Sequence, residues 1–208
     1  MLGSMTVQEK KGRSATGGAV LRQQVTEAIT DAAFAELAEA GYARMSMESV
    51  ARRAGVGKAA LYRRWPSKQA MVTELVRSKV TDALPPTPAT GALHTDLREL
   101  LATFRDQLAH PLLARIAAGL LAEASHDGAL AEGLYTGVTA PRRAAARAIL
   151  QGAMDRGELP PALDLDLGTD LLIAPLAFRV LVIQGLSDDE YLETLTNAIE
   201  AALKAAVR

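Results

Sequence analysis

Apolar residues recur along most of this chain at the three- and four-residue spacing of a helix surface, and the alternation typical of strands is missing. In the first such segment, Val25, Ile29, Ala33 and Leu37 form a stripe that predicts an amphipathic helix ending at Gly41. The same pattern predicts helices at about 21–41, 46–55, 58–65, 68–84, 93–109, 111–125, 127–156 with a break at Pro141, 165–184, and 188–208. We therefore expect an all-α fold.

Prolines and glycines divide the chain. The stretch "PPTPATG" places three prolines within four positions, which no helix sustains, so it predicts a linker over residues 84–92. This gives an N-terminal helical domain at 21–83 and a C-terminal helical domain at 93–208. Residues 1–20 are polar and basic and indicate a flexible arm, of which residues 1–4, "MLGS", resemble a cloning remnant.

Charge is distributed unevenly along the 208 residues, although the net charge is only −1. The first 70 residues carry eleven Lys and Arg against six Asp and Glu, whereas the remainder is acidic. A basic end on an acidic body favours contact with a polyanion. The chain has no cysteine, no apolar run of membrane-spanning length and no secretory leader, so we expect a cytoplasmic protein without a membrane partner.

The basic residues gather around the sequence "AGVG" between the second and third predicted helices. Two short helices joined in this way are typical of a helix-turn-helix, in which the second helix enters the DNA major groove. Lys58 would begin that helix, and Tyr62, Arg63 and Lys68 would lie where hydroxyl and cationic groups reach phosphate. The alternative is an ordinary solvated helix surface, which is the simplest interpretation of Arg52, Arg53 and Arg64. Trp65 is predicted to be a core residue.

The stretch "MSMESVARRAGVGKAALYRRWPSKQAM" resembles the DNA-binding signature of the TetR (tetracycline-repressor-like) family of bacterial transcription regulators. The resemblance covers about residues 22–82. It implies a three-helix, helix-turn-helix DNA-binding domain followed by a helical ligand-binding and dimerisation domain. Together with position along the chain, it assigns to DNA the residues Ser46, Lys58, Ala59, Ala60, Tyr62, Arg63 and Lys68.

Two departures from the family pattern affect which DNA sequence is read. Gly57 stands where the family often has a capping serine, so a cap and a phosphate contact are lost. Ala59 and Ala60 replace positions that often carry a hydroxyl, which leaves apolar contacts such as those with a thymine methyl group.

The resemblance also implies a ligand cavity among the middle helices and a dimer interface formed by the last two. Low aromatic content favours an apolar or amphiphilic small-molecule effector, with candidate pocket residues Phe104, Leu108, Leu120, Tyr135 and Phe178. The candidate dimer residues are Leu172, Leu176, Val180, Ile183, Leu195 and Ile199. A symmetric homodimer would present two reading helices ~34–36 Å apart to a palindromic operator.

The sequence gives little support for a metal site or an enzyme active site. His94, His110 and His126 are scattered among separate elements, and a loop starting at Asp164 would have neither the glycine at the sixth position nor the distal glutamate of a calcium loop. We therefore expect no metal, no cofactor and no enzyme activity. The favoured hypothesis is a ligand-responsive repressor. Two alternatives remain: the same fold acting as an activator or ligand-independent regulator, and a helical small-molecule-binding protein or enzyme without DNA function.

Overall fold

The structure is a computed structural model that describes residues 17–82 and 87–206, and within these ranges it contains helices and no strand. The all-α prediction is confirmed. The elements are α1 (Gly17–Arg44), α2 (Met47–Ala54), α3 (Lys58–Arg64), α4 (Lys68–Asp82), α5 (Leu93–Leu108), α6 (Pro111–Ala124), α7 (Gly128–Leu134), the π-helical turn η1 (Tyr135–Thr139), α8 (Ala140–Asp155), α9 (Leu165–Phe178), the π-helical turn η2 (Arg179–Ile183) and α10 (Asp189–Ala205). No helix in the described part of the chain is both long and apolar enough to cross a membrane.

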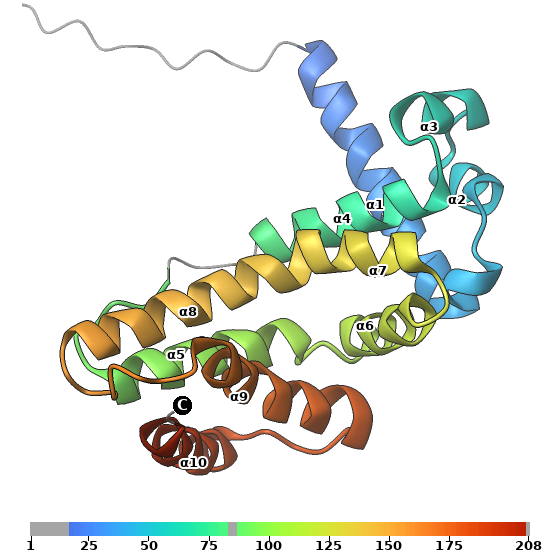
Figure 1. The fold of residues 1–208 in the computed structure, drawn as a ribbon. Helices are drawn as coiled ribbons and strands as arrows, with labels where there is room; N and C mark the ends of the chain where they lie inside the picture. Colours follow the sequence, from blue (N-terminus) through green and yellow to red (C-terminus); the bar gives the residue numbers. More distant parts are fainter. Residues whose placement is uncertain (1–16, 83–86, 207–208) are drawn as a thin grey trace, which may run out of the picture.

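The short helices α2 and α3 lie at one end of the molecule, and α9 and α10 lie at the other (Figure 1). Between them, α4 packs against α7 and η1, and α7, η1 and α8 follow one another along a nearly continuous axis (Figure 1). Glycines allow the close approach of α4: a Cβ on Gly133 would lie 2.7 Å from side-chain atoms of Thr73, and one on Gly137 would lie 3.1 Å from Arg77 Cβ.

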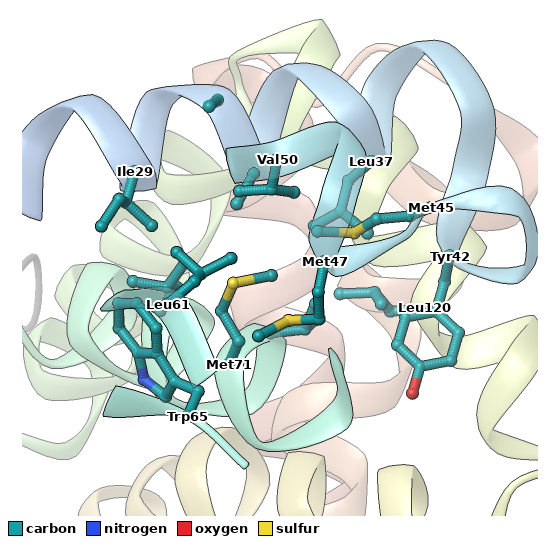
Figure 2. Close-up of a cluster of buried hydrophobic side chains, with 14 of the residues drawn as sticks. Ile29, Leu37, Tyr42, Met45, Met47, Val50, Leu61, Trp65, Met71 and Leu120 are labelled. Atoms are coloured by element: carbon teal, nitrogen blue, oxygen red, sulfur yellow. The ribbon is translucent and has the colours of Figure 1, made fainter. Parts of the chain in front are cut away.

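Two hydrophobic cores hold the helices together. The first joins α1–α4 to α6 and α7, through residues such as Ile116, Leu120, Leu130 and Leu134. Figure 2 shows Leu120 of α6 beside Tyr42 of α1 within this cluster. The second core joins α5, α8, α9 and α10. The cores therefore do not divide at residues 84–92, because α6 and α7 pack with the N-terminal helices despite following the linker.

The first helix begins earlier and ends less simply than its sequence pattern predicts. Residues 17–20, expected in the flexible arm, form the first turn of α1, while residues 1–16 lie outside the described residues. Gly41 has φ 77 and ψ 165, which interrupts the helix at the predicted position, and residues 42–44 form one further turn. This left-handed conformation favours glycine, since a β-carbon would oppose it.

The predicted break at Pro141 is wrong. The chain stays helical from α7 through α8, and the π-helical turn η1 immediately precedes Ala140 and Pro141. Pro141 lacks an amide hydrogen and so leaves a gap in the helical hydrogen-bond ladder, and the π-helical turn η1 lies directly before this gap, where the chain passes from α7 into α8 without a break. The predicted starts of α5 at Leu93 and of α9 at Leu165 match the structure.

Candidate nucleic-acid interface

The corner between α2 and α3 has the backbone geometry of a helix-turn-helix. Gly55 adopts a left-handed conformation with φ 68 and ψ 26, and its amide donates to carbonyl oxygens of the last turn of α2. The amide of Val56 donates to the carbonyl oxygen of Ala51 at 3.0 Å, and the Val56 side chain packs on the first core. These contacts fix the direction in which α3 leaves the turn.

Helix α3 has one buried side and one exposed side. Leu61 is fully buried and Trp65, which follows the helix, is 1% exposed, so both anchor α3 to α1 and α4. Trp65 is thus the core residue that the sequence predicted. On the outer side Lys58, Ala59 and Arg63 are exposed, and Tyr62 has an exposed fraction of 41%. Ala60 is partly buried.

The exposed cations of this surface differ in how they are paired. The ammonium of Lys58 forms an ion pair with the carboxylate of Glu48 in the first turn of α2, and it lies 5.6 Å from the centre of the Tyr62 ring. The pair raises the pKa of Lys58 and lowers the pKa of Glu48, because each charge stabilises the other. Arg63, in contrast, has no ion pair within the described residues, so its guanidinium is open to a phosphate.

Two of the predicted DNA-binding residues also hold the fold together. The Ser46 hydroxyl accepts from the amide of Ser49 at 3.1 Å and the Ser49 hydroxyl accepts from the amide of Ser46 at 3.2 Å, a reciprocal cap on α2. The ammonium of Lys68 donates to the carbonyl oxygen of Tyr42 at 2.8 Å and stacks on the Tyr42 ring. Lys68 therefore joins the start of α4 to the end of α1, and its expected phosphate contact stays a prediction.

Arg53 and Arg64, which the sequence places on a solvated surface, are both exposed and paired with side chains of the fold. Arg53 of α2 forms ion pairs with Glu36 and Glu39 of α1, and these raise its pKa. Arg64 stacks on the Trp65 ring at 4.4 Å and donates to the Thr26 hydroxyl at 2.6 Å. Arg52 is exposed.

Sequence reasoning missed Tyr42 and Asp127 as partners of this surface. The Tyr42 hydroxyl donates to an Asp127 oxygen at 3.4 Å, and the other Asp127 oxygen caps α7 by accepting from the amide of Leu130 at 3.0 Å. Burial, reinforced by Asp127 and Glu123, raises the pKa of Tyr42 to about 12. The two residues lie 85 positions apart, so no local sequence pattern indicates the contact.

The five candidate pocket residues do not share one cavity. Phe104 lines a cavity in the second core together with Gln107, Arg142 and Leu172, and the volume of this cavity is about 30 Å³. Leu120 lines a different cavity, of about 230 Å³, between α1 and α6. Leu108 is buried, whereas Tyr135 and Phe178 are more than half exposed. The spacing of apolar residues along the chain does not show which face of each helix is buried and which is exposed.

The candidate dimer residues divide in a similar way. Leu172, Leu176 and Ile199 are almost completely buried in the second core of their own chain, so they are not available to a partner. Val180 and Leu195 are partly buried, and Ile183 is 56% exposed. The large apolar side chains exposed at this end of the chain are instead Leu167, Phe178, Val182, Ile183 and Leu186.

The histidines have surface and capping roles. His94 lies between the carboxylates of Glu200 and Glu193, at 3.0 Å and 3.1 Å, and His110 caps α6 by accepting from the amide of Leu112. Among the described residues, no three His, Cys, Asp or Glu side chains gather as metal ligands would. Asp164 caps α9, while Asp166 and Asp170 pair with Arg147 and Arg143 of α8.

Comparisons with known proteins agree with this geometry. The family model for bacterial regulatory proteins of the tetR family matches residues 29–75, and the model for the tetracyclin repressor-like C-terminal domain matches residues 87–199. The HTH-type transcriptional regulator YdeS of Bacillus subtilis is 31% identical over 192 residues, which cover 91% of each chain.

Two further relatives point the same way. The DNA-binding transcriptional repressor TetR of Mycobacteroides abscessus is 28% identical over 172 residues, which cover 83% of this chain and 90% of that protein. The crystal structure of the TetR family transcription regulator SCO0332 superposes with a TM-score of 0.66 at 30% identity, covering 86% of this chain and 97% of the other. With both family models matched, and the C-terminal one alone spanning more than half of the chain, this protein belongs to the TetR family of helix-turn-helix transcriptional regulators.

Proposed function

We propose that this regulator is a ligand-responsive repressor that binds a palindromic operator as a homodimer. The observation that carries the proposal is the surface of α3, on which Lys58, Tyr62 and Arg63 project outward from a helix anchored by Leu61 and Trp65. A rigid helix with an exposed hydroxyl and cations fits the major groove and its flanking phosphates. The printed name of the relative from Mycobacteroides abscessus supports repression as the mode of action.

Exposed apolar side chains at the opposite end of the molecule support the homodimer. Phe178, Val182, Ile183 and Leu186 follow one another through the end of α9, through η2 and into the loop before α10, and each is more than half exposed. A cluster of this kind is costly in water and is typical of a protein interface. Regulators of this family bind DNA and act as dimers, and a two-fold axis near α9 and α10 would direct both α3 helices toward the same DNA.

The second core offers a route by which an effector would change the spacing of the two α3 helices. Helix α8 belongs to the core that contains the small cavity, and it continues through η1 and α7, which pack against α4. An effector that shifts α8 would therefore displace α4 and, with it, the helix-turn-helix. Release follows if the effector binds the DNA-free conformation more tightly than the DNA-bound one.

The test is a selection of bound fragments from the source genome, followed by fluorescence anisotropy on the best fragment at several salt concentrations. We expect a palindromic site whose affinity falls steeply with salt, because phosphate contacts release counterions. A footprint over the promoter supports repression, and one upstream of it indicates activation. If no fragment is enriched and Arg63→Ala binds as weakly as the wild type, the DNA-binding proposal is wrong and a purely small-molecule-binding protein becomes the better interpretation.

A further inference from the structure

Arg142 differs from its neighbours on α8 in having no carboxylate partner. Arg143 and Arg147 pair across to α9, with Asp170 and Asp166, on the outer face of the bundle. Arg142 forms no ion pair within the described residues. Burial lowers its pKa, and no neighbouring carboxylate opposes this effect.

The guanidinium of Arg142 is turned into the cavity of the second core. One of its terminal nitrogens, Nη2, donates to the Oε1 atom of Gln107 at 2.7 Å, and the group lies over the Phe104 ring, 5.0 Å from its centre. Its Nε atom is buried and has no hydrogen-bond partner in the described part of the chain. The other lining residues are mainly apolar and come from α5 and α9, including Leu100, Leu172 and Ile173.

The Arg142 side chain is partly buried, its Nε atom is fully buried, and no carboxylate of the described residues pairs with the guanidinium. Removal of a guanidinium from water is costly, and one amide oxygen with one aromatic ring compensates for it only in part. An unsatisfied buried N–H adds a further penalty. The partner that fits a guanidinium best is a planar carboxylate, which accepts from two N–H groups at once.

We infer that Arg142 is the anion-binding residue of an effector site, and that the effector is an apolar molecule with a carboxylate group. This inference rests on the proposed ligand-responsive function. The carboxylate would accept from the unpaired Nε–H of Arg142, which ligand binding must uncover, and the apolar body would lie among the side chains of α5, α8 and α9. The present cavity of about 30 Å³ has room for the headgroup alone. The body of the ligand must therefore separate these helices, so that binding moves α8.

The first experiment measures direct binding to the full chain without DNA. The probes are straight-chain carboxylates of six to fourteen carbons and naphthoate, each compared with its methyl ester and with an alkyltrimethylammonium of similar length. Calorimetry and thermal shift are recorded for the wild type, Arg142→Gln and Arg147→Gln. Arg147 is the matched control, because it lies on the same helix and pairs with Asp166 outside the cavity.

We expect at least one carboxylate to bind the wild type and Arg147→Gln about tenfold or more tightly than its ester does, since a charge-assisted hydrogen bond is lost in the ester. Arg142→Gln should lose that preference while still binding the ester. The inference is overturned if no carboxylate binds the wild type, if esters or cations bind equally well, or if Arg142→Gln retains the preference. Arg142→Met is a second variant of similar volume, and its thermal stability shows whether loss of binding reflects unfolding.

A separate measurement distinguishes failure of the effector assignment from failure of the repressor proposal on which it rests. Operator binding by ligand-free protein is measured by anisotropy, and the carboxylate that binds most tightly is then added. If the protein binds the operator but no carboxylate, the repressor proposal stands and the effector assignment fails. If a carboxylate binds through Arg142 while no operator is found, the site is real and the regulatory role is wrong.

Discussion

The ammonium of Lys68 lies 4.3 Å from the centre of the Tyr42 ring and donates a hydrogen bond to the carbonyl oxygen of the same residue at 2.8 Å. A cation at this point meets the unpaired carbonyls at the end of α1, where the helix dipole favours positive charge. Tyr42 in turn reaches Asp127 at the start of α7. The contact thus links the base of the helix-turn-helix to the helices that follow the linker.

Substitution of Lys68 by methionine should reduce both stability and operator affinity. The cation–π and carbonyl contacts are lost, at a cost of about 1 kcal/mol in the free energy of unfolding. Because the ammonium is directed at α1, we expect the slope of log affinity against log salt to stay unchanged. Urea unfolding and salt-dependent anisotropy provide the two measurements. A slope smaller by about one, with unchanged stability, would instead show a direct phosphate contact.

Substitution of Arg63 by alanine should weaken operator binding about tenfold, since a charge-assisted contact to phosphate is lost. The salt slope should fall by about one. The side chain is exposed and forms no ion pair in the described part of the chain, so thermal stability should not change. Tyr62→Phe should give a smaller loss that leaves the salt slope intact. Equal affinity of Arg63→Ala and wild type across all salt concentrations would remove Arg63 from the interface.

Substitution of Glu48 by glutamine should strengthen DNA binding. The change frees the ammonium of Lys58 from its ion pair and removes a negative charge beside the phosphates. We expect higher affinity for both operator and unrelated DNA, with a salt slope larger by up to about one. Competition anisotropy with operator DNA and with unrelated DNA measures the two affinities. Glu99→Gln, on α5, is the control for a general change in net charge, and an equal gain in that variant would argue against the role of Lys58.

Substitution of Tyr42 by phenylalanine should reduce the loss of folding stability at alkaline pH. The folded protein raises the pKa of Tyr42 to about 12, above the ordinary value near 10. The folded state therefore binds this proton more tightly, and the associated stability is complete below pH ~10 and is lost as pH rises toward ~12. Urea unfolding at a series of pH values should show a shallower alkaline decline in Tyr42→Phe than in wild type. An alkaline decline as steep in Tyr42→Phe as in the wild type would contradict the assignment.

Substitution of Val182 by aspartate should disrupt the dimer. Val182 is 63% exposed within the apolar cluster at the end of α9, and a charge buried at an interface is strongly unfavourable. Sedimentation should show monomers, and operator affinity should fall because each half-site is then bound alone. Tyr135→Asp is the control, since Tyr135 is 52% exposed and lies in η1, which packs against α4, α7 and α8. Monomers in the control, or dimers in Val182→Asp, would place the interface elsewhere.

The sequence predicts local features of this protein well because they depend on neighbouring residues. Helix positions follow from apolar spacing, the turn at Gly55 from its need for a left-handed backbone, and the cap at Ser46 from the chemistry of a hydroxyl before a helix. The exposed face of α3 follows in the same way, because Leu61 and Trp65 indicate its inner side. The resemblance of the helix-turn-helix segment to the TetR family depends on the same local features.

Only the tertiary structure decides which charges are paired and which apolar faces are covered. Lys58 meets Glu48, Lys68 meets the end of α1, and Tyr42 meets Asp127, each through packing that no local spacing specifies. The apolar pattern of α9 and η2 is equally ambiguous: Leu172 and Leu176 of α9 are buried in the core, while Phe178 of α9 and Val182 of η2 remain exposed. Arg142 is one of several arginines in the sequence, and burial beside Phe104 is what distinguishes it. Periodicity gives the helices, whereas the environment of each side chain depends on which helices meet.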